Sequence, residues 1–201
     1  MLSIDPIVEG HSEVYSVPIL LRRFAHEVFE EFEFNALPPY RLQEGRIVAG
    51  PHLENAVTFG RRKLDLCDGR SAILIICDAD DDCPGQTAPA LLQWVTPIVP
   101  HVPTRVVFAK SEYESWFLAA VHSLRGHGRM ANDAVAPADP EAIRGAKEYL
   151  ERNCMVPGAT YSPTIDQPAF TQRFSFDEAR QSCPSFDKLW RDLERLFQQE
   201  A

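Results

Sequence analysis

Acidic residues crowd together at the end of one strongly apolar segment of the chain. Five apolar residues, 73–77, run directly into Asp78, Asp80, Asp81 and Asp82. Carboxylates this close repel one another, so either water solvates them in a loop or a cation holds some of them together. An extended chain directs alternate side chains to one face, so Asp78 and Asp80 are expected to act together. Asp81 and Asp82 are expected to be solvated loop residues.

Two further pairs of acids follow other apolar segments. Glu9 and Glu13 come after the first apolar segment of the chain. Glu112 and Glu114 come after the apolar residues 104–109. Carboxylate oxygens suit Mg²⁺ or Mn²⁺, and Mg²⁺ usually combines a few protein ligands with substrate phosphate. The three groups of acids therefore predict a site for one or two divalent cations.

Some of these acids also have a purely structural explanation. Glu114 lies three residues after Ser111, which is the spacing of a helix capping box. Glu13 and Glu112 fall near the starts of expected helices, where the helix dipole favours acids. Glu9 precedes a glycine at a strand end and has no such explanation, so a functional role is favoured for it.

Basic residues are fewer, and two lysines are weak candidates for contacting a phosphate. Lys63 ends the basic run 61–63, which fits a solvated helix face equally well. Lys147 either points back toward the acids or lies on the surface. The net charge of −9 disfavours a passive DNA-binding module, because such modules are usually basic. A nuclease is less affected, since bound divalent cations add positive charge at the site itself.

Strands and helices are expected to alternate along the first part of the chain. The expected strands are residues 2–8, 40–48, 71–78 and 104–109, and the expected helices are residues 12–34, 51–66, 91–99 and one that starts at Ser111. This alternation predicts an α/β fold, a mostly parallel sheet with helices on both faces. Such sheets bind ligands at the carboxyl ends of their strands, where the three groups of acids fall. Pro6 has no amide hydrogen, so it indicates that the first strand is an edge strand or bends early.

The second part of the chain is expected to be helical. A polar loop at 126–140 precedes helices expected at 140–153, near Phe176 and at 185–199. The predicted organisation is an α/β domain at 1–139 and a helical C-terminal extension at 140–201 packed on it. Five scattered cysteines without CxxC spacing indicate reduced thiols. With neither a signal-peptide pattern nor a membrane-spanning segment, the protein is expected to be cytoplasmic and away from membranes.

The order of these motifs resembles the Toprim domain. "IVEGHSE" followed by "ILIICDAD" matches its glutamate after the first strand and its Asp-x-Asp after a later strand. The resemblance is closest to a bacterial Toprim-like branch related to nucleases of the overcoming-lysogenization-defect type. The further motifs of that branch match residues 112–119 and 184–186, so the resemblance covers about residues 4–195. It implies a Toprim or Rossmann-like sheet.

The resemblance also implies a reaction, which is metal-dependent cleavage or transfer at a phosphodiester of DNA or RNA. Glu9 matches the general acid/base position, and Asp78 and Asp80 match the Mg²⁺ ligands. Glu13 matches a further acid of the nuclease branch, which implies a second metal. Glu112 or Glu114 would complete that second site. Related nucleases work with an ATPase in phage defence or DNA repair, and this chain has no GxxxxGK[ST], so the ATPase would be a separate protein.

Two other functions remain open at this point. The first is a non-catalytic Toprim-like module that docks on an ATPase through its helical extension, which the acidic net charge favours. The second is a nucleotide-sugar glycosyltransferase whose Asp-x-Asp holds a metal on a diphosphate. Glu9 argues against the transferase, because that enzyme needs a nucleotide-binding loop after its first strand.

Overall fold

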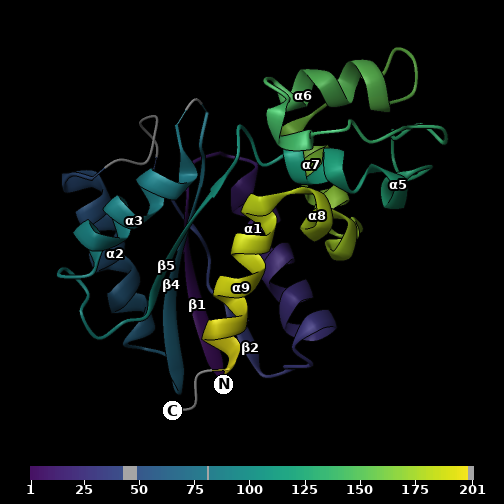
Figure 1. Ribbon diagram of the computed structural model, residues 1–201. Helices are drawn as coiled ribbons and strands as arrows, with labels where there is room; N and C mark the ends of the chain where they lie inside the picture. The colour runs from purple at the N-terminus through teal and green to yellow at the C-terminus, as the bar shows by residue number, and fades with distance from the viewer. Residues whose placement is uncertain (43–48, 81, 199–201) are drawn as a thin grey trace.

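The chain folds around a parallel sheet (Figure 1). The computed structural model describes residues 1–42, 49–80 and 82–198. Within these residues the strands are β1 (Leu2–Val8), β2 (Phe34–Ala36), β3 (Tyr40–Arg41), β4 (Arg70–Asp78) and β5 (Thr104–Ala109). The strand order is β2-β1-β4-β5, with β3 also pairing with β1, and each of these pairings is parallel. The predicted α/β class is confirmed.

Helices cover both faces of this sheet. The α-helices are α1 (Glu13–Arg23), α2 (Pro51–Leu64), α3 (Pro84–Val95), α4 (Ser115–Ala119), α5 (Val121–Leu124), α6 (Ala146–Tyr149), α7 (Pro163–Thr171), α8 (Phe176–Ser182) and α9 (Pro184–Gln198). Shorter π and 3-10 turns are η1 (Phe24–Val28), η2 (Pro140–Ala142) and η3 (Leu150–Cys154). The core on one face includes α2 and α3, and the core on the other includes α1 and α9. None of the described helices is both long and apolar enough to cross a membrane.

Pro6 lies in a central strand, so the expectation of an edge strand is wrong. The C=O of Ile4 accepts a hydrogen bond from Leu37, and the C=O of Val8 accepts one from Leu42. Pro6 faces the same edge of β1, because direction alternates along a strand. On that edge, β2 pairs with the start of β1 and β3 pairs with its end. Pro6 therefore falls in the gap between them, where no amide hydrogen is needed.

Several boundaries differ from those expected. The helix expected to run to residue 34 ends at Val28, and Glu30 follows in a left-handed conformation with φ 52°. Phe34 then begins β2, and the centre of its ring lies 5.4 Å from that of Phe197 in α9. This contact packs the segment against α9. The helix expected at 91–99 starts earlier, as α3. Most of the strand expected at 40–48 lies outside the described residues.

One hydrophobic core joins the sheet to the C-terminal helices. The Phe24 ring of η1 stacks on Phe176 of α8 at 4.3 Å. Phe186 of α9 packs edge-on against Trp116 at 5.3 Å, and Trp116 Nε1 donates a hydrogen bond to Ser185 Oγ at 2.8 Å. Residues 140–198 thus pack on the sheet and share its core. The apolar face of α9 is buried in this core, so an ATPase could meet only the outer surface of that helix.

Candidate functional site

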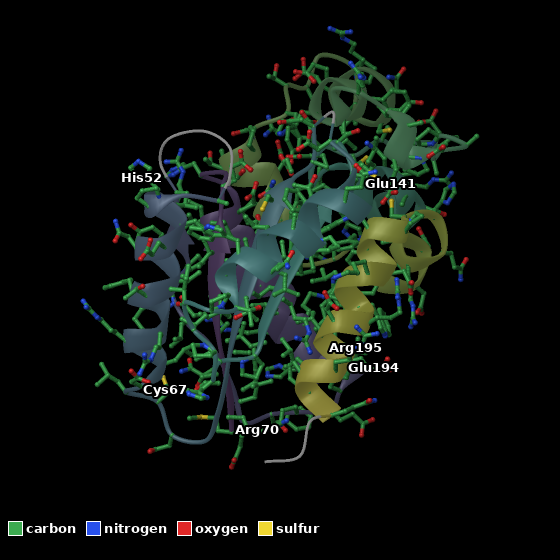
Figure 2. The ribbon with its side chains drawn as sticks, turned by 60° about the vertical axis from the view of Figure 1, so that its left-hand side comes forward. His52, Cys67, Arg70, Glu141, Glu194 and Arg195 are labelled. Atoms are coloured by element: carbon green, nitrogen blue, oxygen red, sulfur yellow. The ribbon has the colours of Figure 1, made fainter. Side chains whose placement is uncertain are left out.

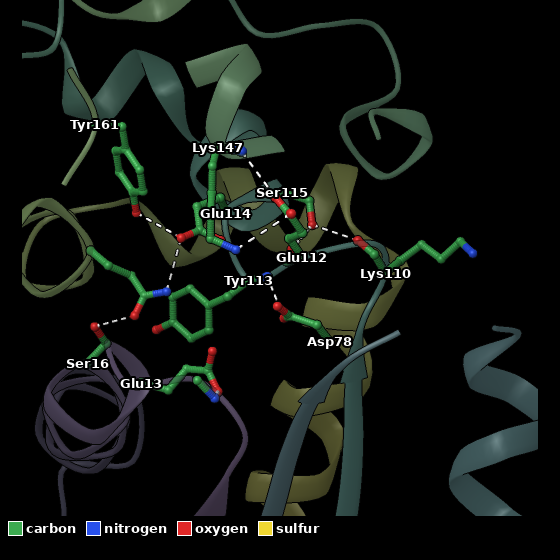
Figure 3. A network of polar contacts seen from close by, with 12 residues as sticks. Glu13, Ser16, Asp78, Lys110, Glu112, Tyr113, Glu114, Ser115, Lys147 and Tyr161 are labelled. Carbon is green, nitrogen blue, oxygen red and sulfur yellow. Dashed lines mark hydrogen bonds and ion pairs between the residues drawn. The ribbon is translucent and has the colours of Figure 1, made fainter. Parts of the chain in front are cut away.

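Three acidic side chains from three elements meet at the carboxyl edge of the sheet (Figure 3). Glu13 is the first residue of α1, Asp78 is the last residue of β4, and Glu114 lies in the turn between β5 and α4. Because β1, β4 and β5 are parallel, the segments that follow them emerge at the same edge. The structure therefore brings together one acid from each predicted group. We call Glu13, Asp78, Glu114 and the neighbouring Lys147 the acidic cluster.

Glu13 folds back over the loop that follows β1. Its Oε2 accepts hydrogen bonds from the N–H of Gly10 at 2.9 Å and from that of Glu9 at 3.2 Å. A side chain at position 10 would overlap this carboxylate, which explains the glycine. Burial raises the pKa of Glu13 to about 7; the charge of Glu114 also raises it, and the bond from Gly10 opposes the rise. Glu9 is half-buried, and its main-chain N–H contacts the acidic cluster by this bond to Glu13.

Asp78 is anchored by the turn that carries the third acid. Its Oδ1 accepts a hydrogen bond from the N–H of Tyr113 at 2.9 Å. Burial raises the pKa of Asp78 well above its usual range, and the nearby charges of Glu13 and Glu114 raise it further. Burial and mutual repulsion therefore favour the protonated forms of these carboxyl groups.

Glu114 is fully buried, and protein donors surround it. Its Oε1 accepts hydrogen bonds from Tyr161 Oη at 2.9 Å and from Gln167 Nε2 at 3.1 Å. Ser16 Oγ holds Gln167 in place through a bond of 2.8 Å to its Oε1. Burial raises the pKa of Glu114, and the positive charge of Lys147 opposes the rise.

The capping-box explanation for Glu114 is wrong. Helix α4 begins at Ser115, and the Glu114 side chain makes no capping hydrogen bond. Ser111 has a left-handed φ of 63°, and its Oγ instead donates to the main-chain oxygen of Glu141. Glu114 is instead buried in the core, where its carboxylate accepts hydrogen bonds from Tyr161 and Gln167.

Lys147 supplies the positive charge of the acidic cluster. Its Nζ lies 3.4 Å from Glu114 Oε2 and 3.6 Å from Glu112 Oε1. Its main-chain N–H also donates to Glu112 Oε2 at 3.1 Å. Burial alone would lower the pKa of Lys147, but the carboxylates of Glu114, Asp78 and Glu112 outweigh burial and raise it. Lys147 therefore stays protonated, and the structure places it among the acids, one of the two positions left open by its sequence.

Asp80 does not share a face with Asp78. The strand ends at Asp78, and Asp80 adopts a left-handed conformation with φ 47° in an exposed turn. Its N–H donates to the main-chain oxygen of Ser111 at 3.1 Å, which fixes the turn. The alternation of an extended chain thus stops before Asp80, and the expected pairing is wrong. Asp81 lies outside the described residues.

Lys63 lies in a buried ion pair away from the acidic cluster. Its Nζ contacts Asp5 Oδ1 and donates to the main-chain oxygen of Pro38 at 2.8 Å. Asp5 is fully buried in the middle of β1, four residues before Glu9. Burial raises the pKa of Asp5, and Lys63 opposes the rise. This position ties α2 to the sheet and gives Lys63 a structural role.

The donor chemistry of the acidic cluster fits Mg²⁺ or Mn²⁺. Its carboxylates, together with Glu112, outnumber its one ammonium group, and carboxylate oxygens are the ligands these ions prefer. Within the described part of the chain, Glu13 Oε1 and Asp78 Oδ2 accept no hydrogen bond. No three His, Cys, Asp or Glu side chains of the described residues already form a metal-binding group. The described residues thus supply suitable donor atoms without a preformed metal site.

No motif in the sequence pointed to the residues that hold Glu114. Tyr161, just before α7, lies 47 residues from Glu114 in the chain, and Gln167, within α7, lies 53 residues from it. Helix α7 was not expected from the sequence, and it contains Pro163 and Pro168 within its nine residues. Proline at the first position of a helix is itself a start signal, and Pro163 occupies that position. That signal could have identified α7, although not its contact with Glu114.

Comparison with known proteins yields a family. The family model described as Domain of unknown function (DUF4276) matches residues 8–194, which is most of the chain. No curated protein and no solved structure matches the chain. The family's description specifies no reaction, so the function has to be argued from the chemistry of the acidic cluster.

Proposed function

The chain belongs to the DUF4276 family, and we propose that it is a Toprim-like, metal-dependent phosphodiesterase that cleaves DNA or RNA. One observation carries the proposal: the buried Glu13 and Glu114 and the half-buried Asp78 gather around Lys147 at the carboxyl edge of the sheet. Burying like charges opposes folding, and carboxyl groups perturbed in this way concentrate at functional sites. The order of the motifs suggests the reaction class, and the acidic cluster is the proposed place of the reaction.

Each residue of the site has a separate task in this proposal. Glu13 and Asp78 would hold the divalent cation through their carboxylates, each of which has one oxygen that accepts no hydrogen bond from a described residue. The bound cation would polarise the phosphodiester and lower the pKa of the attacking water. Lys147 stays protonated and offsets the charge of the incoming phosphate. Glu9, at the end of β1, takes up or releases the proton.

Cation binding tests the first part of the proposal. Titration of the protein with Mn²⁺ at pH 6.5 in a calorimeter should give saturable binding with release of protons from the cluster. Asp78→Asn should weaken this binding at least tenfold. Asp68→Asn is the matched control, since Asp68 is exposed in the turn that precedes β4, and it should bind as the wild type does. A wild-type protein that binds no Mn²⁺ would overturn the proposal.

Cleavage tests the second part. Supercoiled plasmid DNA and a structured RNA should each be incubated with Mn²⁺ and either the wild type, Asp78→Asn or Asp68→Asn. The wild type and Asp68→Asn should cut at least one substrate, and Asp78→Asn should cut neither. Mn²⁺ binding without cleavage of either substrate would favour the alternative function, a non-catalytic module that docks on a separate ATPase.

A further inference from the structure

The ammonium group of Lys147 contacts the two acids that were expected to complete a second metal site. The resemblance to Toprim nucleases implied that Glu112 or Glu114 would hold a second cation. Lys147 Nζ instead lies 3.6 Å from Glu112 Oε1 and 3.4 Å from Glu114 Oε2 (Figure 3). Both acids of the expected second site therefore already have a positive charge beside them.

The segment that carries Lys147 is attached at both of its ends to the turn that carries Glu112. At the start of the segment, the C=O of Glu141 accepts a hydrogen bond from Ser111 Oγ at 3.4 Å. At its end, the N–H of Lys147 donates to Glu112 Oε2 at 3.1 Å. Figure 2 shows Glu141 at the opposite end of the sheet from Arg70, where β4 begins. Main-chain contacts therefore hold Lys147 at the carboxyl edge.

The carboxylate oxygens of Glu112 and Glu114 all have partners or neighbours of positive charge. Glu112 Oε2 accepts the bond from the main chain of Lys147, and its Oε1 lies beside the ammonium group. Glu114 Oε1 accepts hydrogen bonds from Tyr161 and Gln167, and its buried Oε2 lies beside the same ammonium group. A second cation held by these two acids would need the space that Lys147 Nζ occupies.

Glu13 and Asp78 differ from these two acids. Each has one oxygen, Oε1 of Glu13 and Oδ2 of Asp78, that accepts no hydrogen bond from a described residue. When both are ionised, one divalent cation offsets their charge. Burial opposes the charge of Lys147, but the neighbouring carboxylates outweigh burial and raise its pKa, so Lys147 keeps its charge. One pair of acids is thus suited to a divalent cation, and the other pair is matched with the ammonium group.

We propose that the site takes a single divalent cation, held by Glu13 and Asp78, and that Lys147 replaces the second. This inference rests on the proposed phosphodiesterase and specifies its metal content. In two-metal sites the ions together stabilise the attacking and the leaving oxygens of the phosphodiester. In this chain one ion would act on one side of the phosphate, and the ammonium group of Lys147 would offset charge on the other.

Counting bound Mn²⁺ tests the proposal with the full chain. In equilibrium dialysis at saturating Mn²⁺, the wild type should bind one ion. Lys147→Met should bind two, because loss of the ammonium group frees Glu112 and Glu114 for a second ion. Lys110→Met is the matched control and should bind one. It removes the same charge next to the same turn, from a side chain whose Nζ donates to the main-chain oxygen of Asp82 at 3.1 Å.

Electron paramagnetic resonance shows where the second ion binds. Two Mn²⁺ ions about 4 Å apart, as in two-metal sites, couple magnetically. Lys147→Met should therefore give the broadened spectrum of a coupled pair, and the wild type should give the spectrum of a single ion. Adding Glu112→Gln to Lys147→Met should return the count to one and remove the coupling. In the wild-type background, Glu112→Gln should change the affinity for the single ion less than fivefold, because Glu112 contacts Lys147 and not that ion.

The possible counts distinguish this proposal from the proposed function. A wild type that binds two ions, or a folded Lys147→Met protein that still binds one, would overturn the single-cation site and leave the phosphodiesterase intact. A wild type that binds no Mn²⁺ would overturn both. Circular dichroism checks that Lys147→Met is folded. If it is not, the wild type and Glu112→Gln decide: one ion in each supports the proposal, and a fall from two ions to one overturns it.

Discussion

The two aspartates of the Asp-x-Asp motif occupy different environments, so their substitution should have different effects. Asp78 is half-buried within the acidic cluster, whereas Asp80 is exposed in a left-handed turn. We expect Asp80→Asn to weaken Mn²⁺ binding less than threefold, against at least tenfold for Asp78→Asn. Calorimetric titration of both variants measures this difference. Equal losses would mean that the turn rearranges into the extended pair expected from the sequence.

Glu13 should make the stability of the protein depend on pH in a defined direction. Its pKa is about 7 in the folded protein and 4.5 ordinarily, so folding binds a proton between these values. The stabilisation is complete below about pH 4.5 and is lost as pH rises through 7, by up to about 3 kcal/mol. Glu13→Gln cannot ionise but can still accept the bond from Gly10. Urea unfolding at pH 5 and pH 8 should therefore show a larger loss in the wild type than in Glu13→Gln, and equal losses would contradict this.

At the scale of elements, α2 is tied to β1 by the Asp5–Lys63 pair. Lys63→Met leaves a buried carboxyl without its partner, which should lower the free energy of unfolding by about 3 kcal/mol. Adding Asp5→Asn should restore part of this loss, because the remaining group carries no charge. Arg62→Met, on the exposed side of the same helix, is the control and should change little. Urea midpoints of the four proteins measure the effect. An unchanged midpoint for Lys63→Met would show that the Asp5–Lys63 pair does not stabilise the packing of α2 on β1.

The strands were the most predictable elements, and so were the acids that follow them. Residues 71–78 and 104–109 are apolar on both faces, and they form β4 and β5 with almost the expected bounds. The rule that ligands gather at carboxyl strand ends then placed Glu13, Asp78 and Glu114 at one edge. Each of these inferences depends only on neighbouring residues and on the topology of a parallel sheet.

The details that were not predictable depend on contacts between distant segments. The left-handed turn at Asp80 is fixed by a hydrogen bond to Ser111, which follows another strand. Pro6 is tolerated in a central strand only because the edge of β1 is shared between β2 and β3. Lys147 could be named but not placed, because its position depends on how α6 packs above the turn of Glu112. Local patterns cannot encode such packing.

At the scale of the whole molecule, the acidic cluster is built from both predicted parts of the chain. Glu13, Asp78 and Glu114 come from the first 139 residues. Lys147 and the donors to Glu114 come from residues 140–201. Removing the second part would leave Glu114 buried without its donors or its nearest positive charge, and would expose the core around Trp116. The two parts are therefore expected to fold together as one unit.

Unfolding of the full chain should show this cooperativity. Trp94 packs on one core, and Trp116 and Trp190 belong to the other, so fluorescence reports on both faces of the sheet. Fluorescence and circular dichroism should give one coincident transition in urea. Phe186→Ala should lower the free energy of unfolding by about 3–5 kcal/mol and shift both signals together. Ile165→Ala, an apolar truncation at a side chain that is 66% exposed, is the control and should change stability by less than about 0.5 kcal/mol. Two separate transitions, with only one moved by Phe186→Ala, would instead show that the helices after residue 140 fold independently of the sheet.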